Sequence, residues 1–367
     1  MMMVSYHQRM KKRSTVLLLG KHYWDFPLIE HHTMIDCGNK TVRNEVDFIS
    51  SQPLAFSNIP GLLAATSRLV CPTKDGAFLN IEIFSNDDDN VDKTDTSSPI
   101  LIFIHGVCSS AESIGVQKIA SSAKENNIRV AAIELEGHGL SSGERCVCGD
   151  FDRLVGHVVE AVNHIVSSIG CENVPYFLSG NSLGGVLSVY AAQIISNYEE
   201  EQEFGRLMGI LPIAPAVGVD PDAIPPYLIV QALKLIAFVA PSASLPLTPL
   251  EDPTSYNCPK YTKRNYSGHW PLATSKMLLD VTSNRVINDI ESGSLSLEKL
   301  KCMLVIFGKD DDVVPANDIQ TFFDSMKPLH KELVSIEKAD HGLMSISKHN
   351  KVAAGAMFKF IRESLNK

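Results

Sequence analysis

Apolar and polar positions follow two different patterns along the chain. Between Arg68 and Phe84, two apolar stretches flank the turn Lys74-Asp75-Gly76, which predicts a β-hairpin. From Ile100 onward, short continuous apolar runs alternate with longer amphipathic segments, the pattern of buried strands followed by helices. Such alternation is typical of an α/β fold with a mainly parallel sheet and helices on both faces.

The elements that this rhythm predicts cover most of the chain after Ile100. We expect strands at 100–104, 129–134, 176–178, 208–214, 302–307 and 332–336. Helices are expected near 113–126, over 150–169, directly after residue 182, over 316–325 and over 345–365. The helix at 150–169 has the clearest amphipathic spacing of apolar residues.

The rhythm breaks between residues 216 and 297, where prolines are frequent and the pieces look mostly helical. We interpret 216–297 as a helical cap inserted into a core formed by 61–215 and 298–367. Inside it, residues 224–240 are apolar on nearly every side but too short to span a bilayer. This helix either packs wholly against its neighbours, or lines an acyl tunnel or touches a lipid surface.

Residues 1–60 lack a sustained period and are expected to be a poorly ordered N-terminal extension. The basic cluster Lys11-Lys12-Arg13 precedes an apolar run, 15–20, that is too short for a normal secretory core. The pair His31-His32 has no third ligand at suitable spacing, and the run Asp87-Asp88-Asp89 lacks the pattern of a calcium loop. We therefore expect no metal and no cofactor.

Composition narrows the class of protein. The 367 residues are 44% hydrophobic and 20% charged, which is ordinary for a soluble globular enzyme. A net charge of −9 argues against a nucleic-acid partner. The eight cysteines show no Cys-x-x-Cys spacing, which favours a reducing compartment. We expect a cytoplasmic location, and leave membrane association and organellar targeting by the N-terminus open.

One stretch carries a specific chemical signal. Residues 176–190 read YFLSGNSLGGVLSVY, a short strand, a glycine-rich turn and an apolar helix. Gly180 and Gly184 stand two residues on either side of Ser182, so the backbone can turn sharply and expose the serine hydroxyl at the tip. This context predicts a nucleophile elbow.

A catalytic serine needs a base that is itself held by an acid, and in such a sheet the order along the chain is Ser, Asp or Glu, then His. The loop GKDDDVVP follows a predicted strand and supplies Asp311, with Asp310 as the alternative. The loop ADHGLM follows the last strand and supplies His341. His330 and His349 are set aside because they fall in or beside predicted helical segments.

The developing negative charge on a substrate carbonyl needs preorganised N–H donors. We expect these to be the backbone N–H groups of Leu183, directly after the nucleophile, and of Val107, in the loop after the first parallel strand. His105 and Gly106 begin that loop, and we expect His105 to shape it rather than to react.

These motifs together resemble a known family. IFIHGVCSS, LEGHGLSSGERCVCGDFDRLV, GNSLGG, GKDDDVVP and ADHGLM are similar to the monoacylglycerol lipase group of α/β-hydrolases, which includes caffeoylshikimate esterase-like and serine aminopeptidase-like proteins. The resemblance spans about 68–365. It implies an α/β-hydrolase fold, Ser182, Asp311 and His341 as a catalytic triad, Val107 and Leu183 as oxyanion donors, and a role in lipid metabolism.

The chain departs from that family at two positions beside the predicted site. Asn181 stands where the family usually has His, and Cys108 where it often has Gly. The expected function is a serine esterase or lipase that cleaves monoacylglycerol or a related lipid ester through an acyl-enzyme. The alternatives are a peptidase or amidase of the aminopeptidase-like branch, and a non-catalytic ligand-binding descendant of the fold.

Overall fold

The computed structural model describes residues 40–57, 62–85, 98–169, 174–198, 205–246, 248, 250–251, 264–345 and 347–366. The expectations for Lys11-Lys12-Arg13, residues 15–20, His31-His32 and Asp87-Asp88-Asp89 lie outside these ranges. Regular structure begins earlier than predicted, because helix α2 occupies Lys40–Ser51. The contacts discussed below all lie within residues 44–367.

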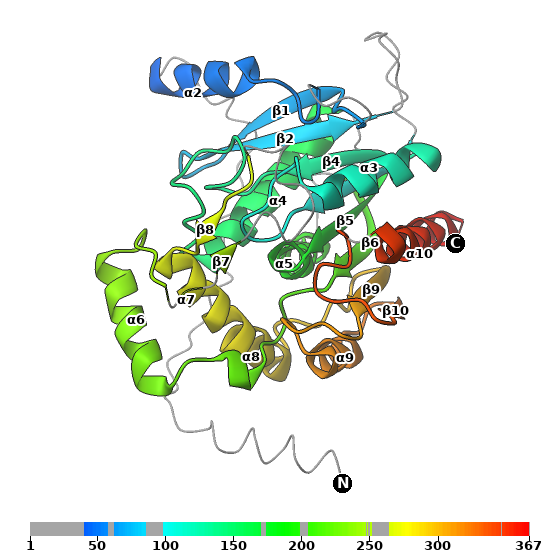
Figure 1. Cartoon of the computed structure of the whole chain (residues 1–367). Coiled ribbons are helices and arrows are strands. Elements are labelled where there is room, and N and C mark those ends of the chain that lie inside the picture. The colour runs from blue at the N-terminus through cyan, green and yellow to red at the C-terminus, as the bar shows by residue number, and fades with distance from the viewer. Residues whose placement is uncertain are drawn as a thin grey trace. The chain divides into compact units, whose positions relative to one another are not determined.

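Eight strands form one sheet in the order β1-β2-β4-β3-β5-β6-β9-β10 (Figure 1). The predicted hairpin is present as the antiparallel pair β1–β2, and β2 also runs antiparallel to β4. From β4 to β10 every neighbouring pair is parallel. The strands are β1 (Ser67–Pro72), β2 (Phe78–Phe84), β3 (Ile100–Ile104), β4 (Arg129–Ile133), β5 (Pro175–Asn181), β6 (Arg206–Ile213), β9 (Cys302–Gly308) and β10 (His330–Ile336).

Helices cover both faces of this sheet, as the alternating pattern predicted. They are α3 (Ile114–Glu125), α4 (Phe151–Ser168), α5 (Leu183–Asn197), α9 (Ala316–Ser325) and α10 (Ser347–Leu365). Helix α4 begins where the Asp150 carboxylate accepts a hydrogen bond from the Arg153 N–H, and Ser113 caps α3 in the same way. The predicted α/β architecture, a mostly parallel sheet flanked by helices, is confirmed.

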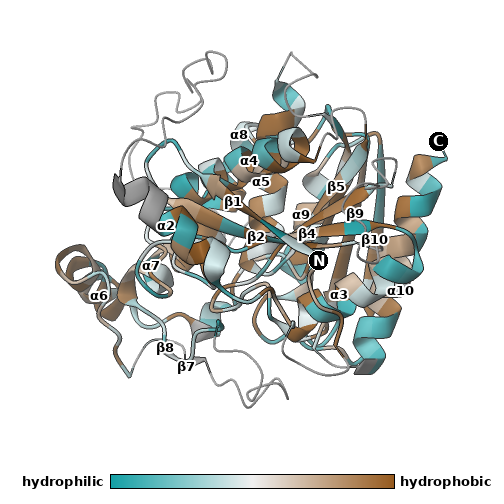
Figure 2. Cartoon of the chain, turned by 90° about the horizontal axis from the view of Figure 1, so that it is seen from above, coloured by the Kyte–Doolittle hydropathy of each residue, from teal (hydrophilic) through white to brown (hydrophobic). Residues whose placement is uncertain are grey.

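The core has two layers, one on each side of the sheet. Ile100, Ile102 and Ile104 of β3 pack with α4 and α5, whereas Leu101 and Phe103 pack with α3 and α10. This two-residue alternation explains why the parallel strands read as continuous apolar runs. Figure 2 shows these strands in brown between the helices.

One histidine was assigned to the wrong kind of element. His330, expected in or beside a helix, is the first residue of β10 and is in register with Cys302 of β9. The strand begins earlier than its apolar residues suggested, because parallel pairing with β9 continues through the polar residues at its start. His349 does lie in α10.

Residues 216–297 contain mainly helical pieces, as expected. These are the short turn η1 (Pro221–Ala223), α6 (Tyr227–Val239), α7 (Leu272–Asp280), the π-helical η2 (Val281–Arg285) and α8 (Val286–Ser292), with a two-stranded ribbon β7 (Leu250–Glu251) and β8 (Gly268–His269). The strands that flank this segment, β6 and β9, are neighbours in the sheet, so it is an excursion between adjacent strands. Its division from the core as a cap stays a prediction. In the part of the chain that is described, no helix is long and apolar enough to cross a bilayer.

A buried ionic cluster joins this excursion to the antiparallel edge of the sheet. Glu82 of β2 is fully buried, and its Oε1 lies 2.5 Å from a guanidinium nitrogen of Arg68 and 2.8 Å from one of Arg264. Arg264 also lies 3.6 Å from the buried Glu134 and 3.4 Å from Glu112. Burial raises the pKa of Glu112. The cluster therefore depends on a cation that the excursion supplies.

We predict that Arg264→Met lowers the free energy of unfolding by about 3–5 kcal/mol, because it leaves buried carboxylates without one of their cations. Urea denaturation of the full chain measures this loss. The control is Lys327→Met, which removes a pair with Glu298 in which both side chains are more than half exposed (67% and 60%). That change should cost less than about 1 kcal/mol. Equal losses in the two variants would contradict a special role for the buried cluster.

Candidate active site

Ser182 stands at the sharp turn between β5 and α5, in an unusual backbone conformation. Its φ is 53° and its ψ is −114°, in the positive-φ region that residues with a side chain rarely occupy. Such strain costs of the order of 1–3 kcal/mol and persists only where neighbours enforce it. Here the Ser182 N–H donates to the Ile213 carbonyl at 3.0 Å, and the Ser182 carbonyl accepts from the Ala216 N–H at 3.1 Å.

The glycines around this turn are needed because backbone segments meet there. A Cβ atom on Gly184 would lie 2.1 Å from the carbonyl oxygen of Ile104, and one on Gly180 would lie 2.3 Å from the carbonyl carbon of Gly184. Both distances are far below van der Waals contact. The predicted elbow is therefore present, with α5 pressed against the ends of β3 and β5.

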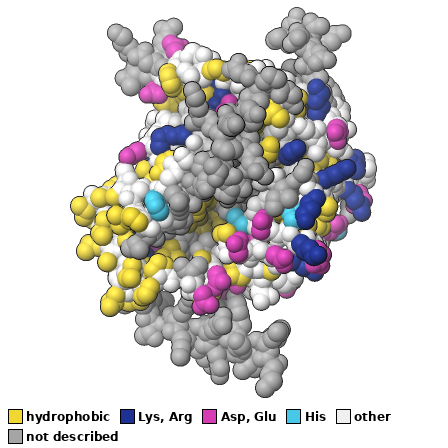
Figure 3. Space-filling model, viewed as in Figure 1, with side chains coloured by type: hydrophobic (Ala, Val, Ile, Leu, Met, Phe, Trp, Pro, Cys, Tyr) yellow, Lys and Arg dark blue, Asp and Glu magenta, His cyan; other side chains and the backbone are white. Residues whose placement is uncertain are grey.

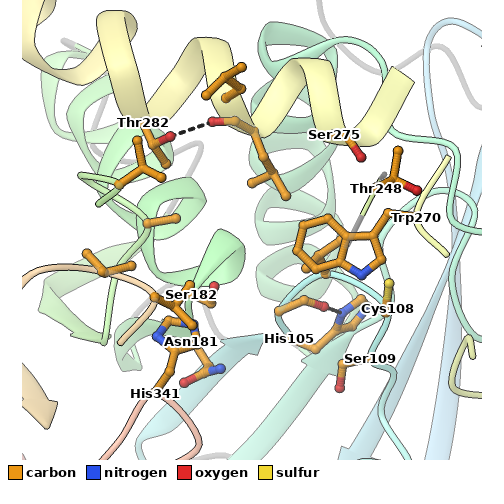
Figure 4. Close-up of a pocket in the computed structure, with 18 of the residues that line it drawn as sticks. His105, Cys108, Ser109, Asn181, Ser182, Thr248, Trp270, Ser275, Thr282 and His341 are labelled. Carbon is orange, nitrogen blue, oxygen red and sulfur yellow. Dashed lines mark hydrogen bonds between the residues drawn. The ribbon is translucent and has the colours of Figure 1, made fainter. Parts of the chain in front are cut away.

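His341 lies beside Ser182 in the close-up view (Figure 4) and is held by a buried carboxylate. Its Nδ1 is 2.9 Å from Oδ2 of Asp311, whose side chain is fully buried. The other oxygen of Asp311 accepts from the N–H groups of Val313 and Val314 at 2.9 and 2.8 Å. Because the carboxylate accepts, Nδ1 carries the proton of the neutral ring and the lone pair lies on Nε2.

The three adjacent aspartates differ in their surroundings. Asp310 and Asp312 are exposed, whereas Asp311 is turned inward to the imidazole. The geometry thus brings together Asp311 and His341 from the loops after β9 and β10, and the alternative residue Asp310 has no such contact with His341 among the described hydrogen bonds.

The loop after β3 is tied to the loop after β4 by two histidines. His105 Nε2 accepts from the Leu135 N–H at 3.0 Å, and His138 Nε2 accepts from the Cys108 N–H at 3.1 Å. The two rings are 5.1 Å apart. Burial lowers the pKa of His105 to about 3, so it is neutral at physiological pH. Its surroundings fit the expected structural role.

Val107 and Leu183 are the two expected oxyanion donors, and that role stays a prediction. Val107 lines the same cavity as Ser182 and His341. Leu183 is the first residue of α5, so its N–H has no partner within the helix. Gly106 lies against Asn181 and Ser182, where an added Cβ would be 3.3 Å from the Asn181 carbonyl oxygen and 3.5 Å from Cβ of Ser182.

A cavity of about 690 Å³ opens above these residues, a size that suits a ligand of drug-like or lipid dimensions. Its far wall comes from the excursion and is largely apolar, with Ile224, Val230, Leu233, Leu278 and Leu279. Figure 4 shows Ser182, Asn181 and His341 gathered on one side of this space and Trp270 on the other.

Three buried polar atoms of the cavity lining have no hydrogen-bond partner among the described residues. They are Oδ1 of Asn181, Nε1 of Trp270 and Oγ of Ser275. An unpaired buried polar atom is costly, so such atoms are suited to meet polar groups of a ligand. The sequence did not single out Trp270 or Ser275, because nothing in their local pattern distinguishes them from core residues.

Residues 95–345 match the family model described as Serine aminopeptidase, S33. The match covers well over half of the chain. The chain belongs to this family. Among the described residues of this family member, no group of three or more His, Cys, Asp or Glu side chains is arranged to hold a metal ion.

Curated relatives of this serine aminopeptidase family member include lipases and an esterase. Over 128 residues it is 35% identical to the monoglyceride lipase of Rattus norvegicus, which covers 35% of this chain and 39% of that protein. Over 73 residues it is 34% identical to the caffeoylshikimate esterase of Arabidopsis thaliana, covering 20% and 22% of the two chains. The match thus spans less than half the length of these relatives.

Solved structures share the fold across most of the chain. The monoacylglycerol lipase of Paleococcus ferrophilus has a TM-score of 0.54 at 20% identity, covering 78% of this chain and 99% of that one. A soluble variant of the monoglyceride lipase of Saccharomyces cerevisiae, in complex with a substrate analog, has a TM-score of 0.61 at 15% identity, covering 83% and 97%. At identities of 20% and 15%, the similarity to these structures supports the fold of this chain and no statement about its activity.

We predict that Gly184→Ala disrupts the elbow of this family member, because the added methyl group must displace the backbone of β3. Overpacking of this kind costs about 1–3 kcal/mol or more. Thermal unfolding of the wild type and of the Gly184→Ala variant measures this loss of stability. The matched control is Gly156→Ala in α4, where an added Cβ meets nothing within 4 Å. Alanine there should be neutral or stabilising by up to about 1 kcal/mol, since it favours helix. A similar melting temperature for the two variants would rule out the close packing.

Proposed function

We propose that the protein is a serine hydrolase that cleaves carboxylic esters of lipids, with monoacylglycerol as the leading substrate. The observation that carries the proposal is the buried Asp311 carboxylate bonded at 2.9 Å to His341, beside a strained serine at the base of a large apolar cavity. The monoglyceride lipases among its relatives support the same substrate class.

In the proposed mechanism, Nε2 of His341 takes the proton of the Ser182 hydroxyl as its oxygen attacks the ester carbonyl. Asp311 fixes the tautomer and stabilises the imidazolium that forms. The N–H groups of Val107 and Leu183 bind the oxyanion. His341 then protonates the leaving alcohol, and a water molecule activated in the same way releases the acid from Ser182.

The cavity supports a substrate with an apolar chain and a small polar end. Its wall from the excursion, which we propose acts as a cap, offers an apolar surface suited to an acyl chain. The unpaired atoms of Asn181, Trp270 and Ser275 are available to hydroxyl groups of the alcohol. Because Asn181 replaces the histidine that the resemblance led us to expect, we propose that it alters the preference for the alcohol.

Ser182→Ala should abolish ester hydrolysis and labelling by a fluorophosphonate probe. Asp311→Asn should lower kcat by about 10⁴-fold, because the amide selects the wrong tautomer of His341. Asp310→Asn serves as the control and should stay within a few-fold of the wild type, since its carboxylate is exposed and does not line the cavity. A large loss in Asp310→Asn, with Asp311→Asn active, would reverse the assignment of the acid.

The family name also raises aminopeptidase chemistry as an alternative. We expect monoacylglycerols to be turned over at least about 100-fold faster, in kcat/KM, than aminoacyl amides, because the cavity is largely apolar and its described lining holds a single carboxylate, that of the exposed Asp312. Parallel assays of monoacylglycerols, lysophospholipids, aromatic esters and aminoacyl amides measure this ratio. Faster amide turnover would move the assignment to the peptidase branch. A protein that neither hydrolyses nor binds the probe would be the non-catalytic descendant.

Helix α6 presents an apolar surface to solvent. Figure 3 shows hydrophobic side chains gathered over this helix. The exposed residues, with the exposed fraction of each, are Tyr227 (73%), Leu228 (79%), Leu235 (69%), Phe238 (86%) and Val239 (78%). The cation of α6, Lys234, is paired with Asp280 at 2.5 Å. We propose that this face rests on a lipid surface and that the adjoining cavity receives the substrate from it.

The double variant Leu228→Ser/Phe238→Ser should reduce binding to phosphatidylcholine vesicles by at least about tenfold, since each side chain contributes of the order of 1.5–3 kcal/mol when buried. Vesicle sedimentation measures the partitioning, and hydrolysis of a water-soluble ester checks that the site is intact. The control is Leu329→Ser, which removes an 81% exposed side chain outside α6. Equal binding by all three proteins would exclude α6 as the contact.

A further inference from the structure

Two cysteine side chains meet where the loop that carries Val107 packs on the loop after β4. The sulfur atoms of Cys108 and Cys146 are 3.0 Å apart, and both residues are buried. Cys108 follows Val107 in the chain and lines the cavity, whereas Cys146 lies behind it and is not part of the lining. A small molecule in the cavity can therefore reach the pair from the side of Cys108.

The backbone holds both cysteines in place. The N–H of Cys108 donates to His138, and its carbonyl accepts from the Tyr266 N–H at 2.8 Å. The N–H of Cys146 donates to the Gly137 carbonyl at 2.8 Å, and its carbonyl accepts from the Thr274 hydroxyl at 2.5 Å. Both have positive φ angles, 63° and 59°. The backbone on both sides of the contact between the sulfurs is thus anchored.

The charge state of the pair favours reaction. The hydrogen bond between the two sulfurs, together with the neighbouring His138, lowers the pKa of the Cys146 thiol against the effect of burial. A thiolate is the reactive form of cysteine. By contrast, burial raises the pKa of the Cys71 thiol to about 12, so that residue stays protonated.

We propose that Cys108 and Cys146 form a peroxide-sensitive modification site, and that the disulfide they form displaces Val107 and switches hydrolysis off. The effect on hydrolysis rests on the proposed function, whereas formation of the disulfide does not.

The proposed reaction needs one peroxide and no other oxidant. Cys108, the member of the pair that faces the cavity, passes its proton to Cys146 across the 3.0 Å contact, and its sulfur attacks a peroxide oxygen. An S–O bond forms, the O–O bond breaks, and hydroxide (or alkoxide, from an organic hydroperoxide) leaves and takes a proton from the solvent. The Cys146 sulfur then attacks the sulfenic sulfur, so the S–S bond forms, the S–O bond breaks, and water leaves with the remaining thiol proton. Together the two thiols lose two electrons, and the peroxide gains these two electrons.

Disulfide formation must shorten the sulfur–sulfur distance from 3.0 Å to about 2.05 Å. Part of this movement falls on Cys108, which is bonded directly to Val107. An oxyanion donor is effective only within a narrow range of positions, and a misplacement of 1 Å can cost about 100-fold in rate. We therefore expect the oxidised protein to lose at least about tenfold in kcat.

The test uses the full chain, reduced and then treated with hydrogen peroxide. After free thiols are blocked, a non-reducing digest should contain a peptide pair linked through Cys108 and Cys146. Hydrolysis of a water-soluble 4-nitrophenyl ester should fall in step with this linkage and recover on addition of dithiothreitol. A linkage through Cys148 instead, or sulfenic acid without any disulfide, would overturn the proposed site.

Variants separate the pair from other thiols. Cys146→Ser, outside the cavity lining, should keep the activity of the reduced protein and resist peroxide. Cys71→Ser, a buried cysteine elsewhere, should remain as sensitive as the wild type. Loss of activity in peroxide-treated Cys146→Ser equal to that of wild type, or a linked wild type with undiminished activity, would overturn the switch. If the reduced wild type hydrolyses no ester, the proposed function fails while the digest still decides whether the disulfide forms.

Discussion

The close approach of helix α5 to the ends of strands β3 and β5 is the constraint on which the site depends. Gly184 leaves no room for a side chain against the Ile104 carbonyl, and this contact forces the chain to turn within one residue. Ser182 takes up the turn in a strained conformation that hydrogen bonds to the β6 side maintain. Because all strands from β4 to β10 are parallel, the loops that carry Val107, Asp311 and His341 end at the same edge as this turn.

Much of this arrangement could be predicted from sequence, since it follows from local patterns. Apolar runs gave the strands, and the carboxyl ends of parallel strands must meet, so Ser182, Asp311 and His341 were expected together although they are far apart in the chain. Which aspartate faces the histidine depended on the turn after β9, where Val313 and Val314 bind one carboxylate oxygen and orient the other. The choice of Asp311 agrees with that contact, and its catalytic role stays a proposal.

The features that could not be predicted are long-range polar contacts. Glu82 alternates with apolar residues in β2, a pattern that predicts a solvent-facing side chain, yet it is fully buried because two arginines reach it. The contact between Cys108 and Cys146 and the paired histidine bonds likewise join loops whose separation no local pattern reveals. These bonds make the loops after β3 and β4 one unit, so a change in either reaches the serine.

The ionic cluster at Glu82 also bears on the order in which the chain folds. Its partner Arg264 is 182 residues further along the sequence, so the bond closes a very long loop. Until Arg264 arrives, packing the hairpin onto β4 would bury Glu82 and Glu134 with fewer compensating cations. The antiparallel edge of the sheet therefore gains its full set of compensating cations only when the excursion docks, and contacts of such high sequence separation are expected to form late and slowly. A segment that only covered the site would supply no cation to the buried carboxylates of the sheet, and the sheet could form without it.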